Sequence, residues 1–376
     1  MPPILSTRAL NRATLARQRL LYRHDGTALQ AIEHLVGLQA QAPIPPYFGL
    51  WCRLERFAAG ELSAALLERR AVRMALLRNT VHLVSARDAL PLRTLLQPVF
   101  DRALRNNASY AAALAGLDLT DLAERGQELL GTRALTSTEL RPLLAGLYPD
   151  RDPQALVQAL RNLLPLVQVP PRGVRGQGGQ PTLMTATGWL GPTLNPAEGN
   201  PTSTLETLVR RYLGAFGPAS VKDLQVWCGL THLRGVLERL RPHLLTFRDE
   251  AGTELFDLPE APRPPETTPA PARLLAAFDN LLLSHADRRR FMTAPAHQRL
   301  FSVKNGIFPH TFLLDGFVAG TWTLDQRREA AQLTIEPFGE LSDAARSALT
   351  AEADRLLALA AADAGQTDVV FIDPRG

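Results

Sequence analysis

Two glutamines, Gln39 and Gln41, stand one residue apart in an otherwise apolar segment that runs from Leu35 to Pro46. A carboxamide buried without hydrogen-bond partners costs roughly 1–3 kcal/mol. Each side chain must therefore be satisfied by the protein or be offered to a ligand.

Whether the two amides can act together depends on the backbone that carries them. Residues two apart diverge on an α-helix but project from the same face of an extended segment. Pro43 disfavours helical backbone at the residue before it, so we expect the helix that starts near Ala28 to end around Leu38 and the glutamines to converge. The alternative is structural: the amides cap the helix end and bond to the turn that contains Pro43, Pro45 and Pro46.

A second polar group lies in the next predicted hairpin, just after the turn at Arg78 and Asn79. Strand alternation places Thr80 and His82 on one face. A histidine within a strand is more often a satisfied structural group than a base or a ligand. No Cys or second His stands nearby at ligand spacing, so we expect no metal and no cofactor.

A third polar group fills the stretch Phe278–Arg290. Polar residues this dense indicate either a functional surface or a clamp between domains. Three successive arginines can neutralise phosphates, although a solvated run of charge is the commoner explanation. The residues concerned are Asp279, Asn280, His285, Asp287, Arg288, Arg289 and Arg290, with Lys304 and His310 close by in sequence.

The composition is that of an ordinary globular protein of two to four domains, with 376 residues, 45% hydrophobic and 21% charged. The formal net charge is +4, and Lys222 and Lys304 are the only lysines. Arginine suits phosphate recognition through its planar fork, although a genome rich in arginine codons explains the bias equally well. The charge permits a DNA partner without requiring one.

The sequence predicts a location in the reducing cytoplasm. No stretch is long and apolar enough to span a bilayer, and the amino terminus lacks the apolar region of a signal peptide. The two cysteines, Cys52 and Cys228, stand far apart in sequence.

The order of elements predicts three winged-helix units. Helices over Thr7–Arg23, Ala28–Leu38 and Glu61–Arg70 precede strands over Val72–Leu77 and Thr80–Ser85. The second unit has helices at 137–146 and 153–164, strands at 166–169 and 182–186, and a glycine-rich basic wing tip at 172–180. The third has helices near 203–215, 220–227 and 234–241, followed by a hairpin over 244–258 that turns at 249–252.

Beyond a proline-rich connector the pattern becomes that of a small β domain capped by a helix. Strands are predicted at 301–303, 311–314, 317–324, 332–335 and 369–372, a turn at Asp315-Gly316, and a helix over 343–361. The predicted domains are residues 1–90, 91–198 and 199–258 for the winged helices, a linker at 259–272, and the C-terminal domain at 273–376.

Four ordered blocks resemble the bacterial AlkZ and YcaQ family of winged-helix DNA glycosylases. They are Leu38–Gln41, Arg78–Asp88, Tyr212–Ser220 and Phe278–Arg288. The resemblance implies an α+β fold of tandem winged helices followed by a β-barrel-like C-terminal domain, C-shaped around a DNA channel. It implies a monomer that binds double-stranded DNA carrying alkylated purines and needs no obligate protein partner.

The resemblance also implies an activity, the excision of N7-alkylated purines including crosslinked ones, by a monofunctional glycosylase. Gln39 and Gln41 occupy the two ends of the catalytic motif of the family, with the small Ala40 between them. N7 alkylation makes the purine cationic, so it can depart without a general acid, and the amides need only position water. Arg78, Thr80, His82, Asp279, Asn280, His285, Arg288, Arg289 and Lys304 are the candidate DNA contacts.

Two other functions fit the sequence. A winged-helix regulator would bind DNA without cleaving a bond, but such proteins commonly use one unit per subunit and dimerise. A protein-docking scaffold would not bind DNA even at low salt.

Overall fold

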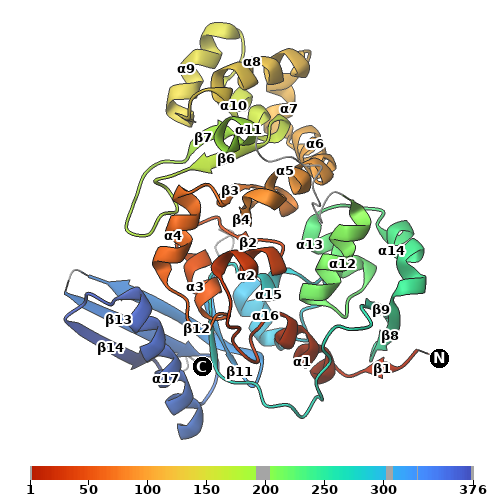
Figure 1. The fold of residues 1–376 in the computed structure, drawn as a ribbon, viewed down its shortest axis with the longest axis vertical. Helices are drawn as coiled ribbons and strands as arrows, with labels where there is room; N and C mark the ends of the chain where they lie inside the picture. Colours follow the sequence, from red (N-terminus) through yellow and green to blue (C-terminus); the bar gives the residue numbers. More distant parts are fainter. Residues whose placement is uncertain (1, 192–203, 302–307, 328, 374–376) are drawn as a thin grey trace.

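The computed structural model describes residues 2–191, 204–301, 308–327 and 329–373. Within these ranges the chain is a mixed α+β fold with sheets of three, five and six strands. The N-terminal unit lies at the centre, between the C-terminal sheet and helices α12–α14 (residues 205–240), and helices α7–α10 (residues 108–163) form a tier above it (Figure 1). Lys304 lies outside the described residues.

The first unit has one helix more than the sequence predicted. The extra helix, α3, begins with Pro45 and Pro46, and proline is tolerated in a first turn because its missing N–H has no helical partner there. The predicted hairpin is confirmed as antiparallel β3 and β4. The elements are β1 (Ile4–Leu5), α1 (Thr7–Arg17), α2 (Ala28–His34), β2 (Leu38–Gln39), α3 (Pro45–Trp51), α4 (Ala59–Leu67), β3 (Ala71–Ala75), the 3-10 turn η1 (Leu77–Asn79) and β4 (Val81–Ser85).

The hairpin of the second unit continues the sheet of the first. Strand β6 pairs antiparallel with β3, which gives the order β2-β4-β3-β6-β7-β5. The two helices and the hairpin predicted between residues 137 and 186 are confirmed. The elements are α5 (Ala86–Leu95), α6 (Gln97–Asn106), α7 (Ala108–Leu114), α8 (Leu119–Gly131), β5 (Leu135–Thr136), α9 (Ser137–Leu147), α10 (Pro153–Leu163), β6 (Leu166–Val169), β7 (Thr182–Thr185) and α11 (Ala186–Leu190).

The third unit has the predicted helices and hairpin. Its hairpin turns at Asp249 and Gly252, and the short β1 pairs in parallel with β8 along one edge. The elements are α12 (Leu205–Phe216), α13 (Val221–Cys228), α14 (Arg234–Leu240), the 3-10 turn η2 (Arg241–His243), β8 (Leu245–Asp249) and β9 (Glu254–Asp257).

The C-terminal domain is not the predicted barrel-like unit. In the described residues its sheet is open, with the order β10-β11-β12-β13-β14, and its edge strands β10 and β14 do not pair with each other. Phe301, predicted in a strand, ends a helix instead. The elements are β10 (Arg273–Leu275), α15 (Asn280–Leu283), α16 (Ala294–Phe301), β11 (His310–Leu314), β12 (Phe317–Gln326), β13 (Ala330–Pro337), α17 (Asp343–Ala360) and β14 (Gln366–Phe371).

The proline-rich connector forms neither a helix nor a strand; it turns at 258–261 and 265–268 instead of running fully extended as predicted, and it is packed against the protein. The Nε of Arg12 donates to the carbonyl of Thr268 at 2.6 Å, and Arg17 donates to the carbonyl of Pro262. Both arginines come from α1, so the connector is held along that helix.

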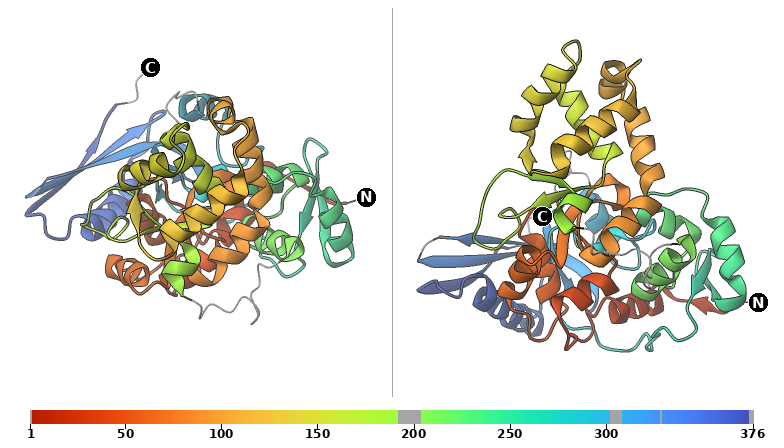
Figure 2. Two further views of the ribbon diagram at one scale, coloured as in Figure 1. Left: turned by 90° about the horizontal axis from the view of Figure 1, so that it is seen from above. Right: turned by 45° about the horizontal axis from the view of Figure 1, so that its top comes forward.

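Two hydrophobic cores meet at the first unit. One joins it to the C-terminal domain and contains Trp51 and Trp322, and the other joins its hairpin to the third unit and contains Met74 and Trp227. A separate core lies within the upper tier, which stands apart from the C-terminal sheet in the right view of Figure 2. The glutamine segment therefore lies where three parts of the chain are packed together.

Candidate active site

Gln39 lies on the short strand β2, opposite His82 of β4. Helix α2 ends at His34, earlier than predicted, because Val36 and Gly37 adopt left-handed backbone with φ of 55° and 96°. A side chain at Gly37 would bring its Cβ within 2.7 Å of the Val84 side chain. The turn that aims Gln39 at the hairpin therefore requires glycine.

The Gln39 side chain is buried and held by Arg78. Its Oε1 accepts a hydrogen bond from Nη2 of Arg78 at 2.7 Å, and Gln39 is 7% exposed. Its backbone N–H donates to Oδ1 of Asn280 at 3.4 Å, and Nδ2 of Asn280 donates to the carbonyl of Gly37 at 2.7 Å. Asn280 thus supports the backbone on both sides of Leu38.

The Gln41 side chain is exposed and is held by the same hairpin. Its Oε1 accepts from the backbone N–H of Val81 at 3.0 Å, and the N–H of Ala40 donates to the carbonyl of Val81 at 2.7 Å. The amide oxygens of both glutamines are therefore bonded to residues 78–81, not to the proline turn of the structural alternative.

Ala40, the residue between the two glutamines, has no exposed surface. Its carbonyl accepts from Nη2 of Arg73 at 2.9 Å. The small central residue of the motif is thus tightly packed, and a larger one would have to displace its neighbours.

Arg78 is anchored on two sides. Besides Gln39, its guanidinium donates to the carbonyl of Trp227 at the end of α13. Arg78 has a left-handed backbone, with φ of 56°, and a Cβ at Gly229 would approach its Cα within 3.2 Å. Burial lowers the pKa of Arg78 to about 10, opposed by the Cys228 thiol, so the group stays cationic near neutral pH.

His82 and Thr80 are turned toward the protein. His82 is 1% exposed, and its Nδ1 bonds to the carbonyl of Thr80 at 2.8 Å. Burial, with a contribution from the charge of Arg78, lowers the pKa of His82 to about 3. The half-buried Thr80 donates its hydroxyl to the carbonyl of Leu77. His82 is therefore held inside the protein in this conformation, and its contact with DNA stays a prediction.

The stretch 278–290 is interpreted from the sequence as either a functional surface or a clamp between domains. Its contacts are mainly those of a clamp. Asp279 forms a buried, bidentate ion pair with Arg53, which follows the C-terminal end of α3. The two N–O distances are 2.7 and 2.8 Å. His285 is fully buried, with Nε2 bonded to the carbonyl of Phe216 at 3.0 Å, and burial lowers its pKa to about 3. Asp279 and His285 are thus both buried in this conformation, and their contact with DNA stays a prediction.

The three successive arginines have three different environments. Arg288 is half-buried over the Phe301 ring, 4.3 Å from its centroid, and burial lowers its pKa. The Arg289 side chain is 71% exposed and pairs with Asp287, whereas Arg290 is buried and donates to the carbonyl of Pro218. Of the three, only Arg289 is exposed, and its guanidinium is paired with the Asp287 carboxylate.

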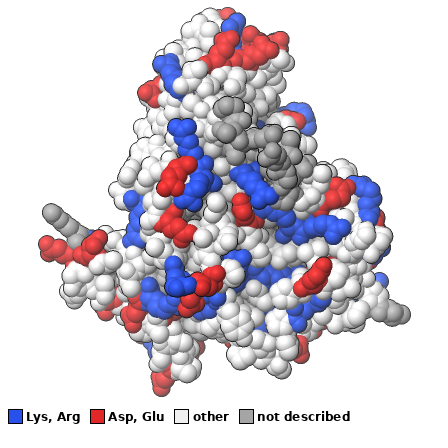
Figure 3. Space-filling model, in the orientation of Figure 1, with Lys and Arg blue, Asp and Glu red and all other residues white. Residues whose placement is uncertain are grey.

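Much of the arginine excess is structural. Arg12, Arg17, Arg53, Arg73, Arg93 and Arg290 are all buried. The face shown in Figure 3 has Lys and Arg side chains interspersed with acidic ones rather than one continuous basic field. Arginine content alone is therefore a poor measure of the DNA-binding surface here.

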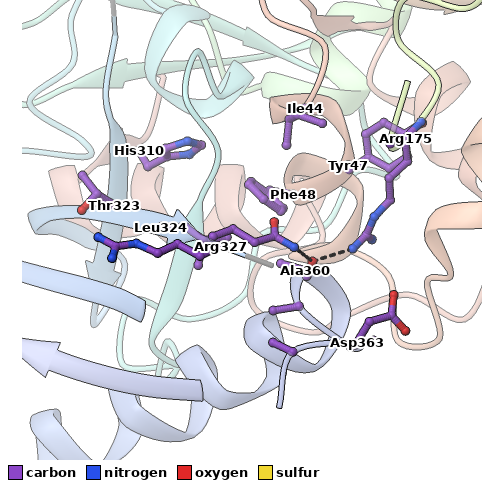
Figure 4. Close-up of a pocket in the computed structure, with 15 residues that line it drawn as sticks. Ile44, Tyr47, Phe48, Arg175, His310, Thr323, Leu324, Arg327, Ala360 and Asp363 are labelled. Atoms are coloured by element: carbon purple, nitrogen blue, oxygen red, sulfur yellow. Dashed lines mark hydrogen bonds between the residues drawn. The ribbon is translucent and has the colours of Figure 1, made fainter. Parts of the chain in front are cut away.

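A cavity of about 760 Å³ lies between α3, the glycine-rich connection and the C-terminal sheet. Ile44, Tyr47, Phe48, His310 and Arg175 contribute to its walls. Arg175 closes one side by donating to the carbonyl of Ala360 at 2.7 Å (Figure 4). The predicted wing tip thus packs against the C-terminal domain, and the lining of this cavity does not include Gln39 or Gln41.

Among the described residues no group of three or more His, Cys, Asp or Glu side chains is placed to hold a metal ion. In the same part of the chain, no helix has the length and apolar character needed to cross a membrane. Both cysteines are buried free thiols.

Sequence comparison identifies the family. Residues 32–359 match the AlkZ-like family, described as DNA glycosylase AlkZ-like. The chain belongs to the AlkZ-like DNA glycosylase family. A relative from Streptomyces sahachiroi, named interstrand DNA cross-link repair glycosylase, is 25% identical over 343 residues, or 86% of this chain and 88% of the relative.

The fold of this AlkZ-like chain is shared with a solved structure. Streptomyces sahachiroi DNA glycosylase AlkZ superposes with a TM-score of 0.81 at 21% identity, covering 98% of this chain and all of the other. The resemblance seen in four short sequence blocks is thus confirmed as family membership, and DNA is the substrate that this membership implies.

Sequence reasoning missed three supports of the glutamines: Arg73, Trp227 and the clamping role of Asn280. Arg73 bonds to Ala40 across 33 positions and Asn280 to Gln39 across 241, whereas Trp227 supports the pair through its bond to Arg78, 149 positions away. No local pattern could have shown these partners.

Proposed function

We propose that this AlkZ-like protein is a monofunctional DNA glycosylase that hydrolyses the N-glycosidic bond of N7-alkylated purines, with Gln39 and Gln41 positioning the water. The observation that supports it best is the arrangement of the two amides. One is buried and one exposed, and both are held by one rigid turn of the hairpin. This preorganisation suits a site that aligns a water molecule and dipoles rather than one that transfers protons.

The chemistry matches the residues that surround the pair. N7 alkylation places a positive charge on the purine, so the C1′–N9 bond can break with its electrons returning to the ring and a neutral base leaving. Water then bonds to C1′ and releases a proton to solvent. Gln39 and Gln41 are bonded to a guanidinium, a backbone amide and Asn280, none of which is an acid suited to protonating a leaving group.

The chain has only two lysines, Lys222 and Lys304, which fits a monofunctional glycosylase that removes the base without cleaving the DNA strand. Bifunctional cleavage requires an amine nucleophile that forms a Schiff base. Lys222 lies on α13, and Lys304 is outside the described residues. The named activity of the Streptomyces sahachiroi relative supports including interstrand crosslinks in the substrate range. We further propose that the three helix–hairpin units act as winged helices around a DNA channel, in a monomer without cofactor.

The deciding experiment is incubation of the purified protein with duplex DNA that contains N7-methylguanine, followed by alkaline strand cleavage at abasic sites. We expect strand cleavage with the wild-type protein and only background levels of strand cleavage with a Gln39→Ala, Gln41→Ala double variant. Binding without cleavage would favour the regulator, and neither binding nor cleavage at low salt would favour the scaffold.

A further inference from the structure

The bond between Arg78 and Gln39 determines which way the Gln39 carboxamide faces. A carboxamide has an oxygen end that accepts and a nitrogen end that donates, and these are distinguished by their hydrogen-bond partners. A guanidinium has donors only. The Gln39 atom that lies 2.7 Å from Nη2 of Arg78 must therefore be the oxygen.

The guanidinium that makes this bond is itself fixed. Its Nη1 donates to the carbonyl of Trp227, so one arginine joins β2 to the end of α13. The left-handed backbone at Arg78 and Asn79, with φ of 56° and 59°, sets the direction of the side chain. Gly229, at φ of 84°, allows the α13 end to pack directly on the Arg78 backbone.

We propose that Arg78 is a positioning residue that holds Oε1 of Gln39 toward the protein and leaves the Nε2 amide as the end of Gln39 that serves the substrate. This inference rests on the proposed glycosylase function. Gln39 then acts on the substrate as a hydrogen-bond donor and not through its carbonyl oxygen. A charged donor on Oε1 also polarises the amide and strengthens its N–H groups.

The assignment differs from the prediction that Arg78 contacts DNA. If Arg78 contacted a phosphate, its loss would weaken DNA binding. It would also reduce the slope of log affinity against log salt by about 0.9, the contribution of one phosphate contact. A positioning residue acts through Gln39, so its loss lowers the rate of bond cleavage at unchanged DNA affinity. The two roles therefore predict different measurements on the same variant.

A double-mutant cycle tests the proposal. Single-turnover rates and DNA affinities are measured for wild type, Arg78→Ala, Gln39→Ala and the double variant. Complete loss of one preorganised donor costs on the order of 100-fold or more in rate. Arg78→Ala leaves the Gln39 donor present but no longer held in place, so we expect it to lower the single-turnover rate by about tenfold or more. In the Gln39→Ala background, loss of Arg78 should have no further effect on the rate.

Two further variants complete the design. Gln39→Glu keeps an oxygen for Arg78 but removes the donor, and we expect it to be as impaired as Gln39→Ala. Arg78→Lys keeps one donor, should recover part of the rate, and serves the same cycle if Arg78→Ala does not fold. Arg141→Ala, a change at an exposed arginine of α9, is the control for loss of an arginine charge.

The outcomes that overturn the inference are additive losses in the cycle, a Gln39→Glu variant as fast as wild type, or an Arg78→Ala defect confined to DNA affinity. An inactive wild-type protein would instead refute the proposed function, so the two failures can be told apart.

Discussion

Asn280 and Gln39 are 241 residues apart in sequence, yet the Asn280 carboxamide accepts a hydrogen bond from the Gln39 backbone and donates one to the carbonyl of Gly37. This contact links the start of α15 to the strand that carries the motif. It means that the C-terminal part of the chain determines where the N-terminal glutamines lie.

Replacing Asn280 by alanine should therefore affect both stability and activity. We expect a loss of about 1–3 kcal/mol in the free energy of unfolding, because the buried carbonyl of Gly37 loses its partner. The single-turnover rate should fall while DNA affinity holds. Denaturant titration and single-turnover assays check this, and Asn106→Ala, a change at an exposed asparagine of α6, is the control. A variant that binds DNA more weakly but cleaves at the normal rate would instead identify Asn280 as a DNA contact.

Replacing either glutamine by alanine should lower the rate of N7-methylguanine release. We expect on the order of 100-fold for each, the typical effect of removing one preorganised polar group. The measurement is a single-turnover assay at saturating enzyme, and Gln177→Ala is a control because Gln177 is an exposed glutamine away from the pair. Full activity in both variants at normal affinity would remove the glutamines from the mechanism.

Replacement of Arg289 and of Arg290 by alanine should affect different properties: DNA binding for Arg289 and stability for Arg290. Loss of the exposed Arg289 should reduce the slope of log affinity against log salt by about 0.9, the contribution of one phosphate contact. Loss of the buried Arg290 should leave that slope unchanged and lower the melting temperature, because the carbonyl of Pro218 loses its donor. DNA binding measured across a salt series, with thermal melting, separates the two. An unchanged slope for Arg289→Ala would exclude it as a phosphate contact.

The protein should become less stable as the pH falls below about 6.5, the ordinary histidine pKa. Burial is the main cause that lowers the pKa of His82 and His285 to about 3 and of His310 to about 4. Each folded-state pKa lies below the unfolded value, so unfolding takes up protons. Stability that is complete above pH 6.5 is therefore lost progressively toward the folded-state values, by about 1.4 kcal/mol per pH unit for each proton taken up.

Urea denaturation across this pH range provides the measurement. His310→Gln should flatten the dependence, because His310 accepts from the Ala277 N–H through Nδ1 and must stay neutral to do so. His243→Gln, a change at an exposed histidine, should leave the dependence as it is. Equal stability at pH 7 and pH 5 would contradict this account.

Much of the local structure could be predicted because its signals are local. The Asp315-Gly316 turn is confirmed, with both residues in the left-handed region that a tight hairpin requires. Helix α9 starts with a capping box in which Thr136 and Glu139 satisfy each other's backbone. Such patterns are complete within a few residues of sequence.

The rest depended on contacts between distant segments. Nothing in the sequence indicates that β6 pairs with β3, or that β10 and β14 leave the C-terminal sheet open. For the site, the glutamines stood out as polar residues in an apolar segment. Whether Arg288, Arg289 and Arg290 face inward or outward could not be predicted, because their environments come from segments far away in the chain.

The parallel pairing of β1 with β8 has a practical consequence. Ile4 and Leu5 cover one edge of the β8–β9 hairpin, and the N–H of Arg248 donates to the carbonyl of Pro3. A truncated version lacking the first six residues would bare that edge, whose free backbone groups can recruit a strand from another molecule. Such a truncation would promote self-association, so an affinity tag is better fused without removing these residues.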